Sequence, residues 1–340
     1  MSRRLSIWSV FLLLASAGFA AGPRIELVWP TPNTAYLEGK PYEAYVQPTV
    51  SGELTSALFG CVRSSGTQFH EGLDLKPISR DRRGEATDEI FATMAGVVRH
   101  VNVRAGDSGY GRYVVIEHTH LRPAVVTLYA HLSAVAPGLK AGDAVALGQV
   151  IGTMGRSAGG YTIPKERAHL HYEIGVMMTR RFQSWYDWKK FGSRNEQGLY
   201  NGMNIMGIDP LDFFGAFRAR RVNNFEEYFA QMPAVAWVRI ATAQVPDFVE
   251  RYPELLTSPM PAEGVSGWDM KVNATGLPFS WTPLPAADVT GMRENEVRLI
   301  EVDADALRNS RCRSIAVSRR GGYAPGRDLE TMLQLVFGLR

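Results

Sequence analysis

Short β-prone runs separated by glycine-containing turns occupy residues 91–175, and they constrain the fold more than any other feature of the chain. The runs cover residues 97–103, 113–118, 124–131, 145–151 and 170–176. Runs of this length at this spacing are typical of antiparallel sheets. The sequence therefore predicts a mainly β, mostly antiparallel domain in this part of the chain.

Two short motifs about a hundred residues apart contain side chains of the kind that hold a catalytic zinc ion. They are His70-Glu71-Gly72-Leu73-Asp74 and His169-Leu170-His171. Such an ion takes about three protein ligands from imidazole and carboxylate groups and keeps a fourth position for water. Alternate residues of a strand point to one face, so His169 and His171 would project side by side. One of them can then bind metal while the other handles protons.

A second histidine pair, His118-Thr119-His120, shows that this pattern is not sufficient by itself. It runs into Pro123, and proline interrupts the hydrogen bonding of a sheet. We expect this pair to end a strand at the surface. His100 lies in an unremarkable context, and we expect it to be structural or exposed.

Further blocks of sequence surround the two motifs. They are Ala95-Gly96-Val97-Val98, residues 109–118, Tyr129-Ala130-His131-Leu132, Gly142-Asp143 and residues 148–152. Together with Phe69 to Asp74 and His169 to Glu173, these blocks resemble the LytM/lysostaphin-type zinc peptidoglycan endopeptidases in their order and approximate spacing. The resemblance covers residues 58–177, with a weaker similarity to about residue 214.

The resemblance implies an antiparallel two-sheet, partly barrel-like LytM-type domain with a metal at the floor of a groove. It implies that His70, Asp74 and His171 bind one Zn²⁺, and that His131 and His169 are the two catalytic histidines. With all five positions filled, we expect an exported enzyme that hydrolyses peptide cross-links of peptidoglycan through a metal-activated water. The alternatives are a non-hydrolytic wall-binding or amidase-activating module of the same fold, and a zinc peptidase acting on protein substrates.

Residues 179–207 are rich in aromatic and basic side chains, and we expect a loop there that forms a groove wall. Trp185 would stack on a peptide or sugar, and Arg180 or Arg181 would pair with carboxylates of the stem peptides. The alternative is that the aromatic side chains pack a satellite core while the arginines face solvent. Glu173 lies on the same strand face as His171, either to orient an imidazole or as a plain strand glutamate.

Residues 1–20 have the pattern of a signal peptide. Arg3 and Arg4 precede an apolar run at residues 5–15, and Gly18-Phe19-Ala20 provides the small residues that a signal peptidase recognises. The run is short for a membrane span, so we expect a protein of the periplasm or cell envelope with no stable span after cleavage. The alternative is an uncleaved anchor. Residues 21–57 should be an extended segment, either a structural leader or an inhibitory cover over the groove.

The rest of the chain is less informative. With 340 residues and 45% hydrophobic content, more than one domain can form, here a zinc peptidase domain at 58–218 and a C-terminal region of unknown type at 219–340. We expect a small α+β appendage with helices at 225–232 and 328–339 and strands at 235–243 and 297–302. A net charge of +3 suits an anionic wall and predicts no nucleic-acid partner. Whether Cys61 and Cys312 pair, and whether a regulatory protein partner exists, stays open.

Overall fold

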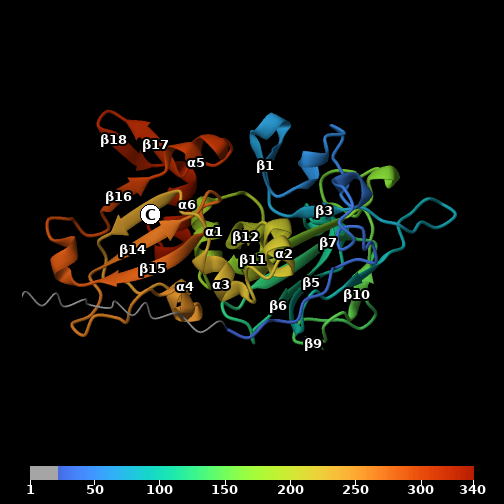
Figure 1. Ribbon diagram of the computed structural model, residues 1–340, viewed down its shortest axis with the longest axis horizontal. Coiled ribbons are helices and arrows are strands. Elements are labelled where there is room, and N and C mark those ends of the chain that lie inside the picture. The colour runs from blue at the N-terminus through green and yellow to red at the C-terminus, as the bar shows by residue number, and fades with distance from the viewer. Residues whose placement is uncertain (1–21) are drawn as a thin grey trace, which may run out of the picture.

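A computed structural model describes residues 22–340, so the expected signal peptide lies outside the described residues. The described chain is mainly β, with several antiparallel sheets and no closed barrel among residues 22–340. Figure 1 shows the strands that precede α1 on the right, and the sheet and helices of the C-terminal region on the left. The prediction of a mainly antiparallel β domain is confirmed. The sheets formed by residues 60–208 stay open and do not close into a barrel.

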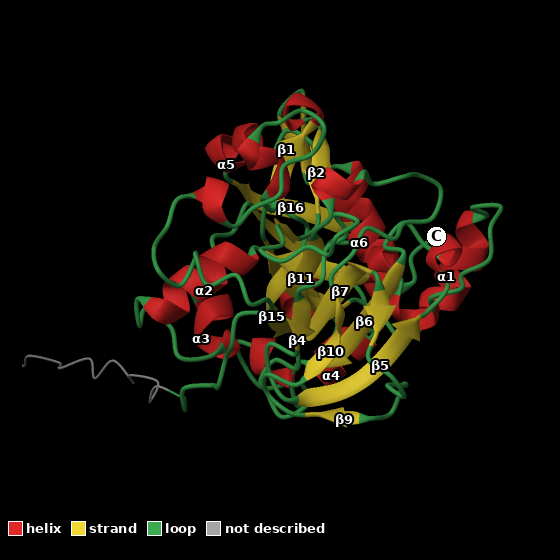
Figure 2. Ribbon diagram, turned by 90° about the vertical axis from the view of Figure 1, so that its right-hand side faces the viewer, coloured by secondary structure: helices red, strands yellow, loops and turns green. Residues whose placement is uncertain are grey.

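The largest sheet has the strand order β12-β11-β7-β6-β5-β9, and β3 pairs with β11 beyond the end of β12. Its strands are β3 (Leu73–Leu75), β5 (Gly96–Asn102), β6 (Arg112–Glu117), β7 (Val126–Leu132), β9 (Ala144–Val145), β11 (Leu170–Met177) and β12 (Ile205–Ile208). Figure 2 shows β11, β7, β6 and β5 side by side. All residues of β7 and β11 are buried, so the centre of this sheet is a rigid base for side chains at its strand ends.

A small sheet and a hairpin accompany the large sheet. The small sheet has the order β4-β10-β8, and the hairpin pairs β1 with β2. Their bounds are β1 (Gly60–Arg63), β2 (Gln68–His70), β4 (Glu89–Phe91), β8 (Ala134–Val135) and β10 (Val150–Thr153). Single-turn 3-10 helices cover residues 42–44, 54–57, 64–66, 105–107, 165–167, 198–200, 202–204, 253–255 and 286–289.

The run at residues 145–151 is two strands and not one. β9 ends at Val145 and β10 begins at Val150, and they belong to different sheets. Between them the N–H of Gln149 donates to the carbonyl of Ala146, and Gly148 has a φ of +73°, a conformation that favours glycine. The turn therefore breaks a run that hydrophobicity alone presents as continuous.

The segment at residues 22–57 packs against the domain as a structural leader. The ring of Trp29 stacks on Tyr36 with 4.5 Å between centroids, and its edge meets Phe214 of α2 (Pro210–Arg218) at 5.0 Å. Val46 forms a bridge to Leu75 of β3. These contacts bury Trp29 and Val46 and hold the start of the described chain against α2 and β3.

The C-terminal region is the expected α+β unit. Its sheet has the order β15-β14-β13-β16, and β17 pairs with β18. The strands are β13 (Ala236–Ile240), β14 (Gly267–Val272), β15 (Pro278–Leu284), β16 (Val297–Val302), β17 (Ala316–Arg319) and β18 (Gly322–Pro325). The helices are α3 (Phe225–Ala230), α4 (Asp247–Arg251), α5 (Ala304–Asn309) and α6 (Arg327–Phe337). The helices and strands predicted from residue 225 onward are thereby confirmed.

Hydrogen bonds and a disulfide attach this region to the first part of the chain. Tyr252 accepts a hydrogen bond from the backbone N–H of Met177 at 3.1 Å, and Arg251 donates to the carbonyl of Met177 at 2.8 Å. Cys61 and Cys312 form a disulfide, which settles the question that the sequence leaves open. The C-terminal region is therefore held against both the end of β11 and the β1–β2 hairpin.

Residues 179–207 contain a helix, α1 (Phe182–Lys189), and are not a continuous loop. Phe182, Trp185 and Tyr186 are spaced to share one helix face, and all three are buried. The helix ends at Lys189, and the next residue, Lys190, has a φ of +52°. These three aromatic residues, which the sequence analysis placed in a loop, form the buried face of this helix.

Among the helices of residues 22–340, none combines the length and the apolar character that crossing a bilayer requires.

The expectation that His118 lies at the surface is wrong. Its side chain, just beyond the end of β6, is fully buried. Its Nδ1 lies 2.8 Å from the carbonyl oxygen of Ala95, which can only accept, so Nδ1 carries the proton. Nε2 then accepts from the hydroxyl of Thr127 at 2.8 Å. Burial lowers the pKa of His118 to about 4. The next turn of chain after Glu117 therefore returns to the core before reaching the exposed His120.

This burial predicts an acid sensitivity that His118→Asn should reduce. The unfolded chain binds the proton at a pKa near 6.5, so stability is present above that pH and is lost as the pH falls towards 4. Between pH 7 and pH 5 the loss attributable to this residue should be about 2 kcal/mol. Urea unfolding at both pH values measures it, and His120→Asn is the exposed control. An equal pH dependence in wild type and His118→Asn would refute the assignment.

Candidate metal centre

The pairing of β3 with β11 brings Asp74 and His171 together. These two residues are direct partners in the antiparallel register. His70 ends β2, and the chain reaches β3 through Gly72, where an added methyl group would lie 2.5 Å from the carbonyl oxygen of Tyr172. Only glycine permits that approach, so the short His70–Asp74 segment can turn tightly against β11.

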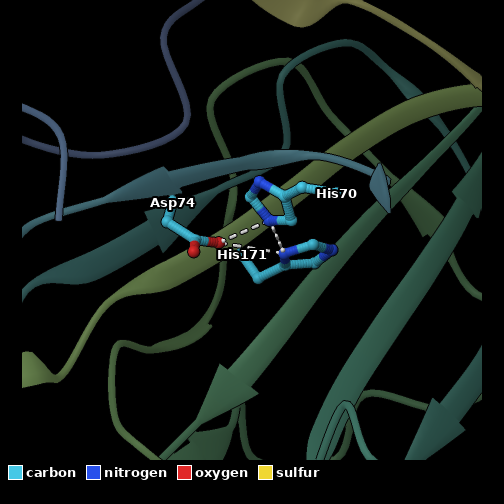
Figure 3. Close-up of side chains that lie close together, drawn as sticks. All are labelled: His70, Asp74 and His171. Atoms are coloured by element: carbon cyan, nitrogen blue, oxygen red, sulfur yellow. Dashed lines mark hydrogen bonds and ion pairs between the residues drawn. The ribbon is translucent and has the colours of Figure 1, made fainter. Parts of the chain in front are cut away.

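The three side chains converge on one point, as Figure 3 shows. His70 Nε2 lies 3.0 Å from His171 Nδ1 and 3.1 Å from Asp74 Oδ1, and His171 Nδ1 lies 3.0 Å from the same oxygen. In a tetrahedral zinc site with bonds of about 2.0–2.1 Å, ligand atoms lie about 3.3 Å apart. The donor spacing therefore fits a zinc ion.

The remaining ring nitrogens fix which atoms face the centre. His70 Nδ1 donates to the carbonyl of Leu58 at 2.7 Å, and His171 Nε2 donates to the carboxylate of Glu173 at 2.8 Å. In its neutral form, each ring would thus turn an unprotonated nitrogen towards the other and towards Asp74. Two lone pairs and a carboxylate oxygen at this spacing are stabilised only by a proton or a cation between them.

Electrostatics agrees with that donor set. Burial acts to raise the pKa of Asp74, but the imidazoles of His70, His169 and His171 hold it well below its usual range. Burial acts to lower the pKa of His171, but hydrogen bonds to Asp74 and Glu173 outweigh it and raise that pKa to about 10. The carboxylate is thus charged at neutral pH and favours positive charge beside it, as a metal site requires.

Two further contacts orient the ligands. Arg63 of β1 donates to Asp74 Oδ2 at 2.6 Å, so the carboxylate offers its other oxygen to the centre. Glu173 Oε1 accepts from the hydroxyl of Tyr110 at 2.6 Å as well as from His171. Glu173 is therefore a buried carboxylate that orients the His171 imidazole, which is the first of the two readings that its sequence position allowed.

His131 and His169 lie beside the three ligands. Their ring centroids are 4.8 Å apart, and that of His131 lies 5.9 Å from His171. His131 Nδ1 donates to the carbonyl of Ser157 at 2.8 Å, and His169 Nδ1 donates to that of Arg167 at 2.7 Å. Both residues therefore keep Nε2 as a proton acceptor.

Both of these histidines are neutral at pH 7. Burial lowers the pKa of His131 well below 6.5, and the neighbouring His169 and His171 lower it further. Burial also lowers the pKa of His169, although the Asp74 carboxylate 3.6 Å from its Nε2 opposes the effect. Two neutral imidazoles next to a metal-type donor set are suited to proton transfer.

A groove of about 780 Å³ opens over the site. Arg63, Tyr110, His131 and His171 line it beside the ligand cluster, and helices α1 and α6 contribute to its walls. Residues 22–57 contribute no lining residue, so in this structure they do not cover the groove. The groove is large enough to hold an extended peptide segment of several residues.

The three predicted substrate residues have different positions. Trp185 lines the groove while it also packs with Phe182 in the buried face of α1. Arg180 and Arg181 do not line the groove, and the backbone N–H of Arg180 donates to Asp247. The exposed arginines and the packed rings agree with the satellite-core alternative, and a substrate contact stays a prediction for Trp185.

Several groove residues escape sequence reasoning. Arg63, Tyr110 and Tyr161 line the groove, and so does Arg313 from the C-terminal region. Tyr110 lies within one of the quoted blocks but has no zinc-ligand or proton-transfer pattern of its own. No spacing signal connects Arg313 with His70, because the two are brought together only by tertiary contacts.

Comparison with known proteins gives a family match for part of the chain. The model of peptidase family M23 matches residues 68–182. Comparison with curated proteins found no match.

Solved structures supply further similarities. The catalytic domain of a mutant of the prophage-encoded M23 protein EnpA from Enterococcus faecalis is 25% identical, with 38% of this chain and 80% of that chain covered and a TM-score of 0.28. A zinc-containing peptidase from Vibrio cholerae is 24% identical, with 45% and 37% covered and a TM-score of 0.29. The catalytic domain of lysostaphin from Staphylococcus simulans is 18% identical, with 50% and 88% covered and a TM-score of 0.28.

Removing the shared carboxylate should abolish metal binding. Asp74→Ala deletes the one anionic ligand and leaves Arg63 facing the two imidazoles, so zinc content should fall from about one ion per chain to near zero. Elemental analysis after dialysis against low zinc measures the change, with circular dichroism to verify folding. Asp288→Ala changes an exposed aspartate and serves as the matched control. A folded Asp74→Ala protein that keeps stoichiometric zinc would place the metal elsewhere.

Proposed function

We propose that this protein is an exported zinc endopeptidase that hydrolyses peptide cross-links of bacterial peptidoglycan, since the model of peptidase family M23 matches residues 68–182. One observation carries the proposal. His70 Nε2, Asp74 Oδ1 and His171 Nδ1 lie about 3.0 Å from one another, beside two neutral imidazoles and at a groove. This combination has the parts that metal-assisted peptide hydrolysis needs.

His70, Asp74 and His171 would hold the zinc ion. Bound there, zinc supplies Lewis acidity that activates a water molecule and polarises the scissile carbonyl. His131 and His169 each present Nε2 as a base, because Nδ1 of each is bound to a carbonyl. We propose that the pair orients the attacking water, accepts its proton at Nε2 and returns that proton to the leaving amine nitrogen.

The groove suits a peptide that carries carboxylates. Its lining includes the aromatic rings of Tyr161 and Trp185, and its cations outnumber its carboxylates: four cations, Arg63, Lys189, Arg194 and Arg313, against three carboxylates, Glu71, Asp107 and Asp328. Cationic and aromatic groups around a cleft favour anionic peptides, and the stem peptides of peptidoglycan are such peptides. We therefore propose stem peptides as the substrate, with no role for nucleic acid at a net charge of only +3.

The disulfide supports the proposed export. A bond between Cys61 and Cys312 persists in oxidising compartments such as the periplasm and is rare in the cytosol. Together with the signal-type pattern at residues 1–20, it supports export to the periplasm or cell envelope.

Replacing His131 by Ala should separate metal binding from catalysis. His131 is not one of the three proposed ligand residues and forms no hydrogen bond with their side chains. The zinc content should therefore stay near one ion per chain, while kcat falls at least about a hundredfold. The assay is release of new amino groups from purified sacculi by the zinc-loaded protein. His120→Ala, an exposed histidine, is the control and should keep full activity. Loss of zinc from His131→Ala would contradict its assigned role.

The same assay separates the alternatives. Release of amino groups by the wild type supports the endopeptidase. Sacculus binding without any release would support a wall-binding or amidase-activating module. Cleavage confined to protein substrates would support a protein-directed peptidase. Mass spectrometry of the released fragments then identifies which bond is cut.

A further inference from the structure

Arg313 carries a positive charge from the C-terminal region to the groove. It follows Cys312, whose disulfide partner Cys61 lies opposite Phe69 in the β1–β2 hairpin. The guanidinium carbon of Arg313 lies 3.9 Å from the centroid of the Phe69 ring. Phe69 directly precedes the ligand residue His70. A covalent link and a stacking contact therefore hold Arg313 against the hairpin that ends at the metal centre.

Most hydrogen-bond donors of Arg313 are not used within the protein. Its one hydrogen bond, from Nη1 to Asp328 Oδ1, is also its ion pair and is long at 3.4 Å, because the other oxygen of Asp328 accepts from the backbone N–H of Ser314 at 2.7 Å. The Nε of Arg313 has no partner among the described residues but is buried, so a ligand in the groove would bind the Nη donors. A guanidinium has five donors and binds a carboxylate at its edge, which stays available when its face stacks on a ring.

The other groove cations lack this combination of rigidity and unused donors. Arg63 is occupied by Asp74 and by the carbonyl of Ser56. Arg194 extends into solvent, with its side chain 89% exposed. Lys189 lies over the rings of Trp185 and Trp188 at more than 5 Å.

Arg313 also belongs to a continuous wall. Thr331, Met332 and Leu335 of α6 line the same groove, as does Asp328 at the start of that helix. The C-terminal region therefore forms one side of the groove, and Arg313 lies where that side meets the hairpin.

We propose that Arg313 is a specificity-determining residue that binds a free carboxylate of the peptide substrate through its unused guanidinium donors, an inference that rests on the proposed function. The carboxylate would lie beyond Phe69, on the C-terminal side of the groove. Stacking on Phe69 fixes the guanidinium plane, so a carboxylate can form two parallel hydrogen bonds there. The protein would thus select anionic peptides over neutral ones of equal length.

The test compares two ligands on two proteins. The ligands are a cross-linked peptide dimer purified from sacculi and the same dimer with its carboxylates converted to amides. Binding is measured by titration calorimetry on zinc-loaded His131→Ala protein, which should not cut the ligand, with and without Arg313→Gln. We expect Arg313→Gln to weaken binding of the native dimer about tenfold and to leave binding of the amidated dimer unchanged.

Controls separate recognition from folding. Arg311→Gln removes an exposed charge two residues away and should change neither affinity. Arg313→Lys keeps the charge and should restore part of the preference for the native dimer. Zinc content and thermal unfolding of each variant reveal any damage to the hairpin. If Arg313 only supports the hairpin, Arg313→Gln will weaken both ligands equally, and that result overturns the inference.

Failure of this inference differs from failure of the proposed function. If the wild-type enzyme cuts both dimers with equal kcat/KM and Arg313→Gln behaves identically, the enzyme stands and the role of Arg313 is refuted. If the wild-type enzyme neither binds nor cuts either dimer, the peptidoglycan substrate is refuted, and the role of Arg313 with it.

Discussion

The pairing of β3 with β11 is the constraint on which the rest of the site depends. It places Asp74 opposite His171, and the close approach at Gly72 lets His70 reach the same point. A register slip of one residue would turn His171 to the other face of the sheet and remove it from the cluster. Because β11 and β7 are buried along their whole length, such a slip would also expose part of the core. Core packing therefore maintains the ligand geometry.

Charge then determines what this geometry can do. Asp74 and Glu173 are buried carboxylates, and each is bound by more than one donor, including Arg63 and Tyr110. They draw positive charge to the ligand nitrogens, whereas burial keeps His131 and His169 neutral. One small site thus combines a place that attracts a cation with two bases that do not compete for it. That division of roles is what hydrolysis assisted by a metal requires.

Local motifs and their order in the sequence predict part of the site. Sequence reasoning predicted the residues that the structure brings together, His70, Asp74, His131, His169 and His171, and most of the strands around them. It failed where tertiary contacts decide the outcome. His118 is buried because the chain turns back to Ala95, and residues 182–189 are helical because their aromatic face packs inward. The disulfide stayed undecided because its cysteines lie 251 residues apart, and Arg313, the residue after Cys312, lines the groove through tertiary contacts that no local motif encodes.

The central claim is that one zinc ion is bound by His70, Asp74 and His171. X-ray absorption at the zinc edge on the loaded wild-type protein tests it most directly. The account predicts a four-coordinate shell of nitrogen and oxygen at about 2.0–2.1 Å, with outer-shell scattering from two imidazoles. Loss of one imidazole's scattering in His171→Ala, together with weaker zinc binding, would complete the assignment. A wild-type shell made of oxygen alone would contradict this claim. So would a spectrum of the His171→Ala protein identical to that of the wild type.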